Sequence, residues 1–491
     1  MTIQSDQAVA DRQLFIDGKF RPSESGASRE VVNPATEEVI CRVAWGTVAD
    51  VEQAVDAAQR AFEGGEWPKL TLKQRGRLLQ RIADAIEEHA EELALLESLD
   101  VGKPIAFTRG FDVPAAADLF RYYGGLVEQL EGSARPAGSR SLAYTRREPL
   151  GVVAAITPFN FPLNLLVNKL APALAAGNTF VHKPAEQTPL STLRLAEILS
   201  EAGLPAGVFN VVTGDGATVG ARLAEHPGVH KLAFTGSTET GKRLIATAAG
   251  TLKKVTAELG GKGANIVFAD ADLDAVTQWA FQAAFFNTGQ FCMSGSRLLV
   301  QRPVYQEMVD RMAAAAGAVT VGDPLDPQTV LGPLAHRAQL DRVVEYVAIA
   351  RAEGAVLRAG GTAGTTGGGD GRGFYHLPTV FSDVTPQMRI AQEEVFGPVL
   401  TITPFDTEDE AVTIANGTPF GLAAGLHTSD VSRAHQVAAR LEAGIVWVNA
   451  WAMFENSTPF GGYKQSGYGR ELGPEGIEEY LQLKTVVINA E

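Results

Sequence analysis

The amino-acid sequence predicts an α/β fold built on a parallel sheet, and two observations carry this prediction. Between Gly151 and Gly250, short runs rich in β-branched residues alternate with segments of helical period, and glycines follow most of these segments. This rhythm repeats as successive strand–helix units, which require a parallel sheet with right-handed crossovers. Ligands of such sheets bind beyond the carboxyl ends of the strands, so the loops that follow the strands are where chemistry is expected.

The first expected elements are helices. Apolar residues on one helical face predict a helix over 47–66, and the pair Thr71 and Gln74 forms a capping-box pattern that opens a second long helix to about Leu99. Strands and helices then alternate, with strands at 151–157, 179–184, 208–214 and 231–236, and helices over 163–176, 189–202, 217–225 and 238–249.

A second mixed α/β region begins near 264–268 (ANIVF), and the glycine-rich stretch 359–373 predicts a surface loop. Residues 126–149 predict a β-hairpin that reaches outside its domain. The run TVVIN at 485–489 predicts a strand without a local partner. Strands so far apart in sequence are expected to pair with each other or with another subunit.

Composition limits the classes of function. The 42 Lys and Arg residues against 57 Asp and Glu residues give a net charge of −15, which argues against nonspecific binding of nucleic acid. Two cysteines, Cys41 and Cys292, exclude a disulfide scaffold and favour a reducing compartment. Prolines and Lys169 interrupt the most apolar stretch, 150–182, and the first residues show no secretory pattern, so we expect a cytoplasmic protein without a membrane span.

Cys292 lies in FNTGQFCMSGSR, where small residues such as Gly289 and Gly295 allow a substrate to approach. It is a candidate nucleophile, although a lone cysteine is more often a buried apolar residue. Glu258, in TAELGGKGAN, ends a β-like run before two glycines and is a candidate general base, with a solvated loop carboxylate as the alternative. Asn160, between two prolines in TPFNFP, is a candidate oxyanion donor, or it satisfies loop carbonyls.

Two further loops are candidates for binding a nucleotide. Lys183 and Glu186 follow a predicted strand in VHKPAEQTP, where a carboxylate can accept ribose hydroxyls, although a solvated ion pair is the commoner arrangement. The segment 234–243, FTGSTETGKR, can present backbone N–H groups to a pyrophosphate. It nearly matches a phosphate-binding P-loop, but Arg243 stands where that motif has Ser or Thr.

Taken together, these segments resemble the aldehyde dehydrogenase superfamily over essentially the whole chain. The motifs TPFNFP, HKPAEQ, FTGSTETG, ELGGK, GQFC, EEVFGP and PFGGYKQSGYGRE occur in that family's order. The resemblance implies that Cys292 is the nucleophile, that Asn160 and the Cys292 N–H form the oxyanion hole, and that Glu258 activates the hydrolytic water. Lys169 and Glu471 match a pair thought to relay protons away from this base.

The resemblance also implies NAD as the cofactor and no metal. The residues expected to contact NAD are Thr157, Lys183, Glu186, Gly216, Gly236, Ser237, Leu259, Glu394 and Phe396. Glu258 favours hydrolysis of the thioester, because family members that acylate coenzyme A generally lack it, and Glu186 favours NAD over NADP. Phe159 departs from the family by replacing the common Trp before the oxyanion asparagine.

The substrate is expected to be a small-molecule aldehyde that enters a tunnel. By resemblance, the tunnel walls are Phe161, Asn164, Leu165, Asn168, Phe291, Met293, Phe454 and Phe460. The phenylalanines suggest an aromatic or medium-sized aldehyde, and the two asparagines hint at a polar substituent, although core packing is the alternative for each phenylalanine.

The resemblance further implies a Rossmann-like cofactor domain from residues 1–125 and 150–258, a catalytic α/β domain from 259–475, and oligomerisation strands from 126–149 and 476–491. A homodimer or homotetramer is therefore expected. The alternatives to this function are a coenzyme A-acylating dehydrogenase, a phosphate-binding NTPase that uses the 236–243 loop, and a non-catalytic protein that has kept the fold.

Overall fold

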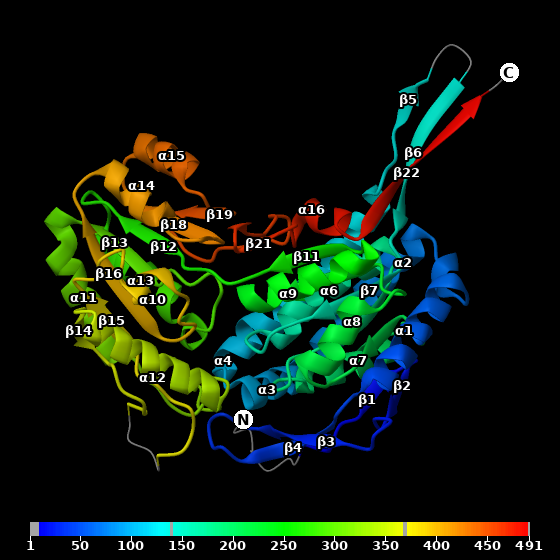
Figure 1. Cartoon of the computed structure of the whole chain (residues 1–491), viewed down its shortest axis with the longest axis horizontal. Helices are drawn as coiled ribbons and strands as arrows, with labels where there is room; N and C mark the ends of the chain where they lie inside the picture. The colour runs from blue at the N-terminus through cyan, green and yellow to red at the C-terminus, as the bar shows by residue number, and fades with distance from the viewer. Residues whose placement is uncertain (1–8, 138–140, 367–370, 490–491) are drawn as a thin grey trace.

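The computed structural model describes residues 9–137, 141–366 and 371–489, and its main feature is two large sheets with a projecting arm (Figure 1). The first sheet has the strand order β2-β1-β9-β8-β7-β10-β11-β21. Its strands are β1 (Leu14–Ile16), β2 (Lys19–Arg21), β7 (Val152–Ile156), β8 (Thr179–Lys183), β9 (Phe209–Val211), β10 (Lys231–Thr235), β11 (Lys254–Glu258) and β21 (Gly467–Tyr468). The five strands from β9 to β11 are parallel, which confirms the predicted α/β class.

Strand order in this sheet reverses between β7 and β10. The chain runs outward from β7 to β8 and β9 on one side, and then returns to build β10 and β11 on the other. Two neighbouring loops therefore leave the sheet in opposite directions at this point, which opens a crevice beyond the carboxyl ends of the strands. This crevice is the part of the sheet best suited to a nucleotide.

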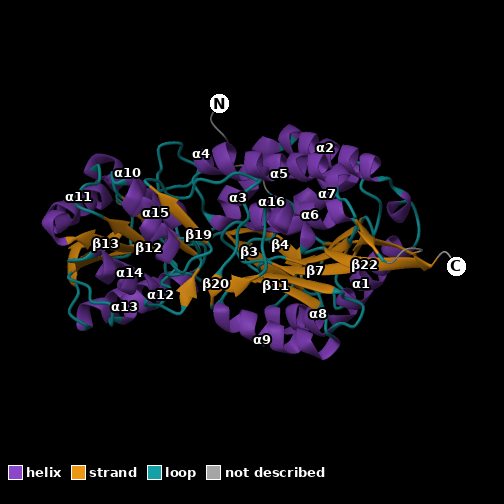
Figure 2. Cartoon of the chain, turned by 90° about the horizontal axis from the view of Figure 1, so that it is seen from above, coloured by secondary structure: helices purple, strands orange, loops and turns teal. Residues whose placement is uncertain are grey.

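Helices cover both faces of the first sheet (Figure 2). One face carries α1 (Val48–Glu63), α8 (Ala221–Glu225) and α9 (Thr238–Ala248), and encloses a core that includes Val51, Val181 and Leu232. The other face carries α2 (Leu72–Glu88), α3 (Ala90–Val101), α5 (Val113–Leu126), α6 (Pro162–Ala176), α7 (Leu190–Glu201) and α16 (Gly473–Glu478). Burial on both faces explains why these strands are continuous apolar runs.

The capping box at Thr71 is present, because Thr71 Oγ1 accepts the Gln74 N–H at 3.2 Å and Gln74 Oε1 accepts the Thr71 N–H at 2.9 Å. The prediction of one helix to about Leu99 is wrong. The helix ends at Glu88, and His89, with φ −103° and ψ 19°, separates α2 from α3. Apolar spacing continues through the break, so periodicity alone did not reveal it.

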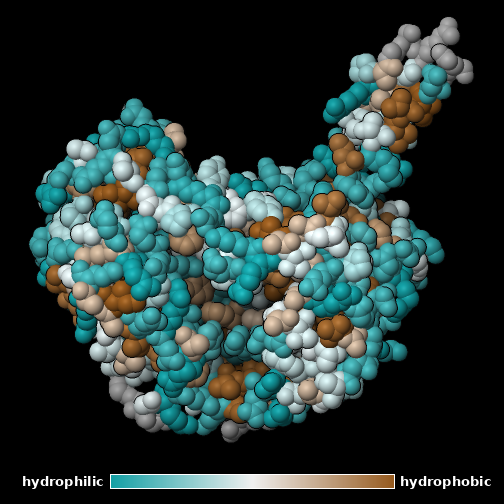
Figure 3. Space-filling view, viewed as in Figure 1, coloured by the Kyte–Doolittle hydropathy of each residue, from teal (hydrophilic) through white to brown (hydrophobic). Residues whose placement is uncertain are grey.

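The second sheet has the order β14-β15-β16-β13-β12-β18-β19 and is parallel except at β14. Its strands are β12 (Ala264–Val267), β13 (Arg297–Gln301), β14 (Val356–Ala359), β15 (Thr379–Ser382), β16 (Val399–Phe405), β18 (Ala423–His427) and β19 (Ile445–Val448). Its helices are α10 (Leu273–Phe285), α11 (Tyr305–Ala318), α12 (Arg337–Ala352), α13 (Arg389–Gln392), α14 (Glu408–Asn416) and α15 (Val431–Arg440). Between the two sheets the surface is hollowed, and apolar residues lie in the hollow (Figure 3).

The arm consists of β5 (Ala134–Pro136), β6 (Ser141–Pro149) and β22 (Leu481–Asn489), which extend away from the body (Figure 1). β22 pairs antiparallel with β6 over its whole length, so the two strands predicted far apart in sequence pair with each other. The hairpin is shorter than expected, because α5 continues to Leu126 and a helical turn follows at Val127–Gln129. Its connection at 138–140 lies outside the described residues.

Smaller elements complete the chain. They are the pairs β3 (Ser28–Val32) with β4 (Val39–Ala44) and β17 (Phe420–Gly421) with β20 (Tyr463–Lys464), and the short helix α4 (Ile105–Phe107). Of the predicted glycine-rich loop 359–373, residues 367–370 lie outside the described part. Among the described residues, no helix combines the length and the apolar character needed to cross a membrane.

Candidate active site

Three expected cofactor residues meet beyond the carboxyl ends of β8 and β9. Glu186 Oε1 accepts the Gly216 N–H at 3.1 Å, and Lys183 lies at the end of β8 with its Nζ donating to the Pro184 carbonyl at 3.0 Å. Burial lowers the pKa of Lys183 to about 8, while the nearby carboxylates of Glu186 and Asp215 favour its charged form. A Cβ at Gly216 would meet nothing within 4 Å, so this loop borders open space.

Two further loops flank the reversal of strand order. Thr157 follows β7, and its Oγ1 lies 2.9 Å from Nε2 of His182. Ser237 is the N-cap of α9, where its Oγ accepts the Thr240 N–H at 3.3 Å. The Gly236 N–H donates to the Glu258 carbonyl at 3.1 Å, so this N–H is already bonded within the sheet. Gly236 has no side chain, and this position requires that, because a Cβ there would lie 2.5 Å from the Phe234 ring.

Cys292 lies on the loop between α10 and β13, directly beside the loop that follows β11. A Cβ at Gly261 would overlap the Cys292 carbonyl oxygen, so only glycine lets these two backbones approach so closely. Burial raises the pKa of the Cys292 thiol well above its usual range, and the carboxylates of Glu394 and Glu258 raise it further. Burial therefore favours the protonated thiol, which must lose its proton before the sulfur can attack a carbonyl.

Asn160 is tied to the cysteine loop by hydrogen bonds in both directions. Its Nδ2 donates to the Gln290 carbonyl at 3.0 Å, and Asn287 Nδ2 donates to the Asn160 carbonyl at 3.0 Å. Asn160 is buried, and no hydrogen-bond partner reaches its Oδ1 within the part of the chain that the structure describes. One N–H of its amide is used by Gln290, and the second is available to a developing oxyanion.

Glu258 is the last residue of β11 and is buried between two other strands. It pairs with Thr235 on β10 and with Gly467 on β21, where any Cβ would overlap the Ala257 carbonyl. Burial raises the pKa of Glu258 well above its usual value, and the Glu471 carboxylate raises it further, whereas the Lys169 ammonium lowers it. A raised pKa makes this carboxyl a stronger base than an ordinary glutamate, which suits a group that takes a proton from water.

Lys169 and Glu471 form a buried ion pair in this region. Lys169 Nζ lies 2.5 Å from Glu471 Oε1 and donates to Thr235 Oγ1 at 2.6 Å. Thr235 is the β10 residue that pairs with Glu258. Through Thr235, the ion pair is therefore bonded to the strand position next to the candidate base. The ion pair and the charge interactions that act on Glu258 are consistent with the expectation that Lys169, Glu471 and Glu258 lie close together.

Glu394 and Phe396 approach the cysteine loop from the second sheet. Glu394 Oε1 accepts the Gly261 N–H at 3.0 Å, and burial raises the pKa of Glu394 to about 7. Phe396 adopts a left-handed backbone (φ 62°), and Gln339 Nε2 donates to its carbonyl at 2.7 Å. Its ring meets Phe159 edge-on at 5.8 Å. A strained residue held in this way is typical of a ligand-binding loop.

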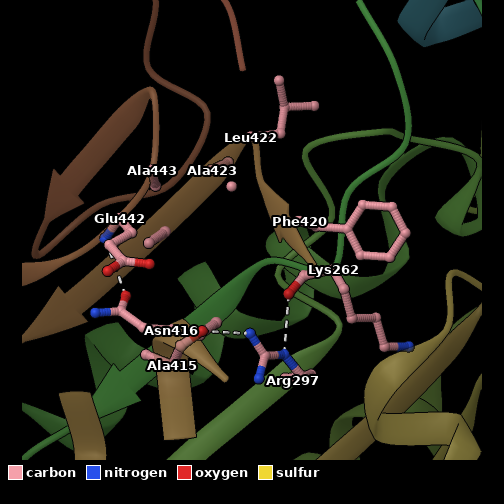
Figure 4. A pocket seen from close by; sticks show the side chains of 12 residues that line it. Lys262, Arg297, Ala415, Asn416, Phe420, Leu422, Ala423, Glu442 and Ala443 are labelled. Atoms are coloured by element: carbon pink, nitrogen blue, oxygen red, sulfur yellow. Dashed lines mark hydrogen bonds between the residues drawn. The ribbon is translucent and has the colours of Figure 1, made fainter. Parts of the chain in front are cut away.

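The loop after Glu258, residues 259–262, is held in place by hydrogen bonds and side-chain contacts. Ser466 Oγ donates to the Gly260 carbonyl at 2.7 Å, and the Leu259 N–H donates to the Ser466 carbonyl at 2.9 Å. Arg297 Nε donates to the Lys262 carbonyl at 2.9 Å at the wall of a small pocket (Figure 4). The Leu259 side chain lies against Gly241 of α9, where a Cβ would be 2.5 Å from Leu259 Cδ2. These contacts fix residues 258–262 relative to both sheets.

Most of the expected tunnel residues gather in one apolar cluster around Cys292. Phe161, Phe291, Met293 and Phe460 are buried, and the half-buried Leu165 and Phe454 pack against them. Sequence reasoning missed several members of this cluster, among them Phe107, Trp279, Phe286, Trp447 and Trp451. The aromatic density of 279–291 was the available signal for Trp279 and Phe286, whereas Phe107 comes from a distant segment that nothing in the sequence linked to the site.

The two asparagines are both bonded to carboxylates. Asn164 Nδ2 donates to Asp112 Oδ1 at 2.8 Å, and Asn168 Nδ2 donates to Glu471 Oε2 at 3.3 Å. Asp112 also accepts from the buried Lys103 at 2.7 Å, and Lys103 Nζ lies 3.8 Å from the centre of the Phe161 ring. Sequence reasoning missed this buried lysine and its carboxylates.

A parallel sheet whose reversal of strand order faces a half-buried cysteine, a buried amide and a buried carboxyl is typical of an oxidoreductase that uses a dinucleotide. The chain belongs to the aldehyde dehydrogenase family, whose model matches residues 20–486.

Three relatives illustrate the similarity. DhaS of Bacillus subtilis (strain 168), which carries an aldehyde dehydrogenase name, is 46% identical over 480 residues, or 98% of this chain and 96% of DhaS. PnpE of Pseudomonas sp. WBC-3 in complex with nicotinamide adenine dinucleotide is 47% identical with a TM-score of 0.95, covering 98% of each chain. An aldehyde dehydrogenase from Bacillus cereus in an NAD⁺ complex is 44% identical with a TM-score of 0.96, covering 98% of this chain and 97% of the other.

Proposed function

We propose that this chain oxidises an aldehyde to a carboxylic acid with NAD⁺, through a covalent intermediate on Cys292. The observation that carries the proposal is the arrangement of the half-buried Cys292 with the buried Asn160 and Glu258 beyond the carboxyl ends of the first sheet. Family membership and the NAD complexes of two similar structures support it.

The residues at the crevice fit NAD. Open space beside Gly216 and the carboxylate of Glu186 suit an adenosine ribose, and that carboxylate would repel a 2′-phosphate. Lys183 would hold the same ribose, Thr157, Ser237 and Leu259 would flank the dinucleotide, and Glu394 and Phe396 would hold its nicotinamide end. NAD⁺, when bound, supplies a hydride acceptor.

The side chains of the protein would carry out the remaining chemistry. The Cys292 thiol gives its proton to water, and the thiolate attacks the aldehyde carbon. The second N–H of the Asn160 amide, with the Cys292 N–H, stabilises the oxyanion of the thiohemiacetal. Loss of hydride leaves a thioester on Cys292. Glu258 takes a proton from water, which attacks the thioester and releases the acid and the thiolate. The Glu471 carboxylate, paired with Lys169, would then accept the proton from Glu258. Oxyanion donors of this kind contribute about 100- to 1,000-fold to kcat.

The alternatives are less well supported. Transfer of the acyl group to coenzyme A would not need the buried Glu258. Phosphate binding by the 236–243 loop would need Lys242 at the helix N-terminus, but Lys242 Nζ lies on the surface, 3.3 Å from Glu239 Oε1. A non-catalytic role would leave the buried titratable groups at the site without a purpose.

The substrate we propose is an aromatic or medium-sized aldehyde with a polar substituent, because aromatic rings surround Cys292 and two half-buried amides lie on α6 beside Leu165 of the same cluster. We expect the purified chain to reduce NAD⁺ when given benzaldehyde without coenzyme A, and to form benzoic acid in equal amount. NADH absorbance and chromatography of the acid measure the two products. NADH formation that requires coenzyme A would contradict the hydrolytic mechanism.

We also propose that residues 1–125 with 150–258, and residues 259–475, act as cofactor and catalytic domains, and that the arm joins two or four copies of the chain. Leu483 and Val487 lie on one face of β22 and are 60% and 62% exposed. Exposed apolar residues in line on a projecting strand are typical of an interface.

Replacing both residues (Leu483→Lys with Val487→Lys) is expected to lower the mass of the assembly measured by light scattering. Leu252→Lys, at an apolar residue that is 92% exposed elsewhere, is the matched control and should leave the mass unchanged. A wild-type protein that is monomeric at micromolar concentration would contradict the proposal.

A further inference from the structure

Asn164 and Asn168 lie one helical turn apart on α6, so their side chains project from the same face of this helix. Phe161 and Leu165, which belong to the apolar cluster around Cys292, lie on this face too. Both asparagines are half-buried. They therefore form the polar part of an otherwise apolar wall.

The carboxylates behind these amides determine which way each amide points. Asp112 accepts from Asn164 through Oδ1 and from Lys103 through Oδ2. Glu471 accepts from Asn168 through Oε2 and from Lys169 through Oε1. Burial raises the pKa of Asp112 to about 7, while the Lys103 ammonium favours its ionised form. An ionised carboxylate can only accept hydrogen bonds, so each asparagine turns its Nδ2 toward the carboxylate.

This orientation leaves the two amide oxygens facing away from the carboxylates. Among residues 9–137, 141–366 and 371–489, no donor bonds to Oδ1 of Asn164 or Asn168, although both side chains keep contact with open space. The wall of the site therefore presents two hydrogen-bond acceptors to whatever lies against α6.

The carboxyl groups near the site also affect which substrates it can accept. The carboxyl groups that act most strongly on Cys292 are Glu394, Glu258 and Glu471, and the Lys103 cluster contains two carboxylates, Glu97 and Asp112, for one lysine. An additional anion on the substrate would be repelled in such surroundings, whereas a neutral or cationic donor would not.

We propose that this site selects aldehydes that carry a hydroxyl or amino hydrogen-bond donor at the end remote from the carbonyl, and that it discriminates against carboxylate-bearing aldehydes. This inference rests on the proposed function and names its substrate class. Asn164 and Asn168 are then specificity-determining residues whose acceptor direction is set by Asp112 and Glu471.

The test compares three substituted benzaldehydes of similar size in both the para and the meta series. Their substituents are hydroxymethyl, which can donate a hydrogen bond; ethyl, which cannot; and carboxyl, which is ionised. We expect kcat/KM with NAD⁺ to be about 10-fold higher for the hydroxymethyl compound than for the ethyl compound in at least one series, the effect of one good hydrogen bond. The carboxyl compound should be the poorest substrate of each series.

Variants separate this preference from general effects on the fold. In Asn164→Leu and Asn168→Leu we expect the ratio of kcat/KM for hydroxymethyl over ethyl to fall toward one in at least one variant. Leu165→Met changes the same wall without changing its polarity, and should keep the wild-type ratio. Should both leucine variants fail to fold, the wild-type comparison of the three substrates still decides the proposal.

Two outcomes would overturn this inference but not the proposed function. One is equal kcat/KM for the hydroxymethyl and ethyl compounds in both series, and the other is a preference for the carboxyl compound. The proposed function would survive either result, because the aldehydes would still be oxidised. An absence of NADH formation with every aldehyde would overturn the proposed function and this inference together.

Discussion

Replacing Cys292 by alanine is expected to lower kcat by at least about 1,000-fold, because no other group can form the covalent intermediate that divides the oxidation into two accessible steps. Cys292 and Cys41 are the two cysteines of the chain, and Cys41 lies in the core near β3. The nicotinamide-ribose and adenosine contacts proposed for Glu394 and Glu186 do not involve the thiol. The Kd for NAD⁺, measured by calorimetry, should therefore change little in Cys292→Ala.

Cys41→Ala is the matched control for this experiment. It removes the other thiol and is expected to keep NAD⁺-dependent turnover while costing some stability, since a buried side chain becomes smaller. Turnover that persists in Cys292→Ala and disappears in Cys41→Ala, with both proteins folded by circular dichroism, would exclude the assignment of the nucleophile.

Replacing Glu258 by glutamine should separate the two halves of the reaction. Hydride transfer requires the thiolate and the oxyanion donors, whereas release of the acid requires a base for water. Loss of a general base typically costs 100- to 10,000-fold, so we expect the steady-state rate to fall by about 100-fold or more. A rapid burst of NADH, close to one equivalent per site, should precede this slow phase in stopped-flow absorbance.

The pH dependence of the slow phase follows from the raised pKa of Glu258. Only the carboxylate can accept a proton from water, and a raised pKa moves the formation of the carboxylate to higher pH. The rate of acid release in the wild type should therefore increase as pH rises through this raised pKa. Glu258→Gln should lose this increase, while Glu239→Gln, at a side chain that is 79% exposed, should retain it. A Glu258→Gln enzyme with the wild-type profile would contradict the assigned role.

The parallel sheet and its loops could be predicted because their signals are local. Short β-branched runs, the glycines after most helices and the capping box at Thr71 depend on neighbouring residues alone. The strands and helices from β7 to α9 lie within a few residues of their predicted positions. The break at His89 was missed because the apolar spacing on both sides of it is compatible with one helix.

Features that depend on distant segments could not be derived in this way. Lys103 pairs with Asp112 beneath Phe161, and the sequence does not reveal that this lysine is buried. Gly236 is expected to face a pyrophosphate, but the sequence does not reveal that its N–H donates to a carbonyl of the parallel neighbour β11. The sequence predicts Asn164 and Asn168 as polar wall residues. It does not reveal the direction of their amides, because that direction depends on carboxylates from η2 (Thr108–Asp112) and from the segment before α16.

The central claim is that the acyl group is carried by the sulfur of Cys292. Glu258→Gln is the variant in which this species should accumulate, because its formation is intact and its hydrolysis is slow. After acid quenching with benzaldehyde and NAD⁺, peptide mass spectrometry should find the added mass of one benzoyl group on the peptide that contains Cys292. A burst of NADH without any adduct, or with the adduct on a different residue, would contradict the claim.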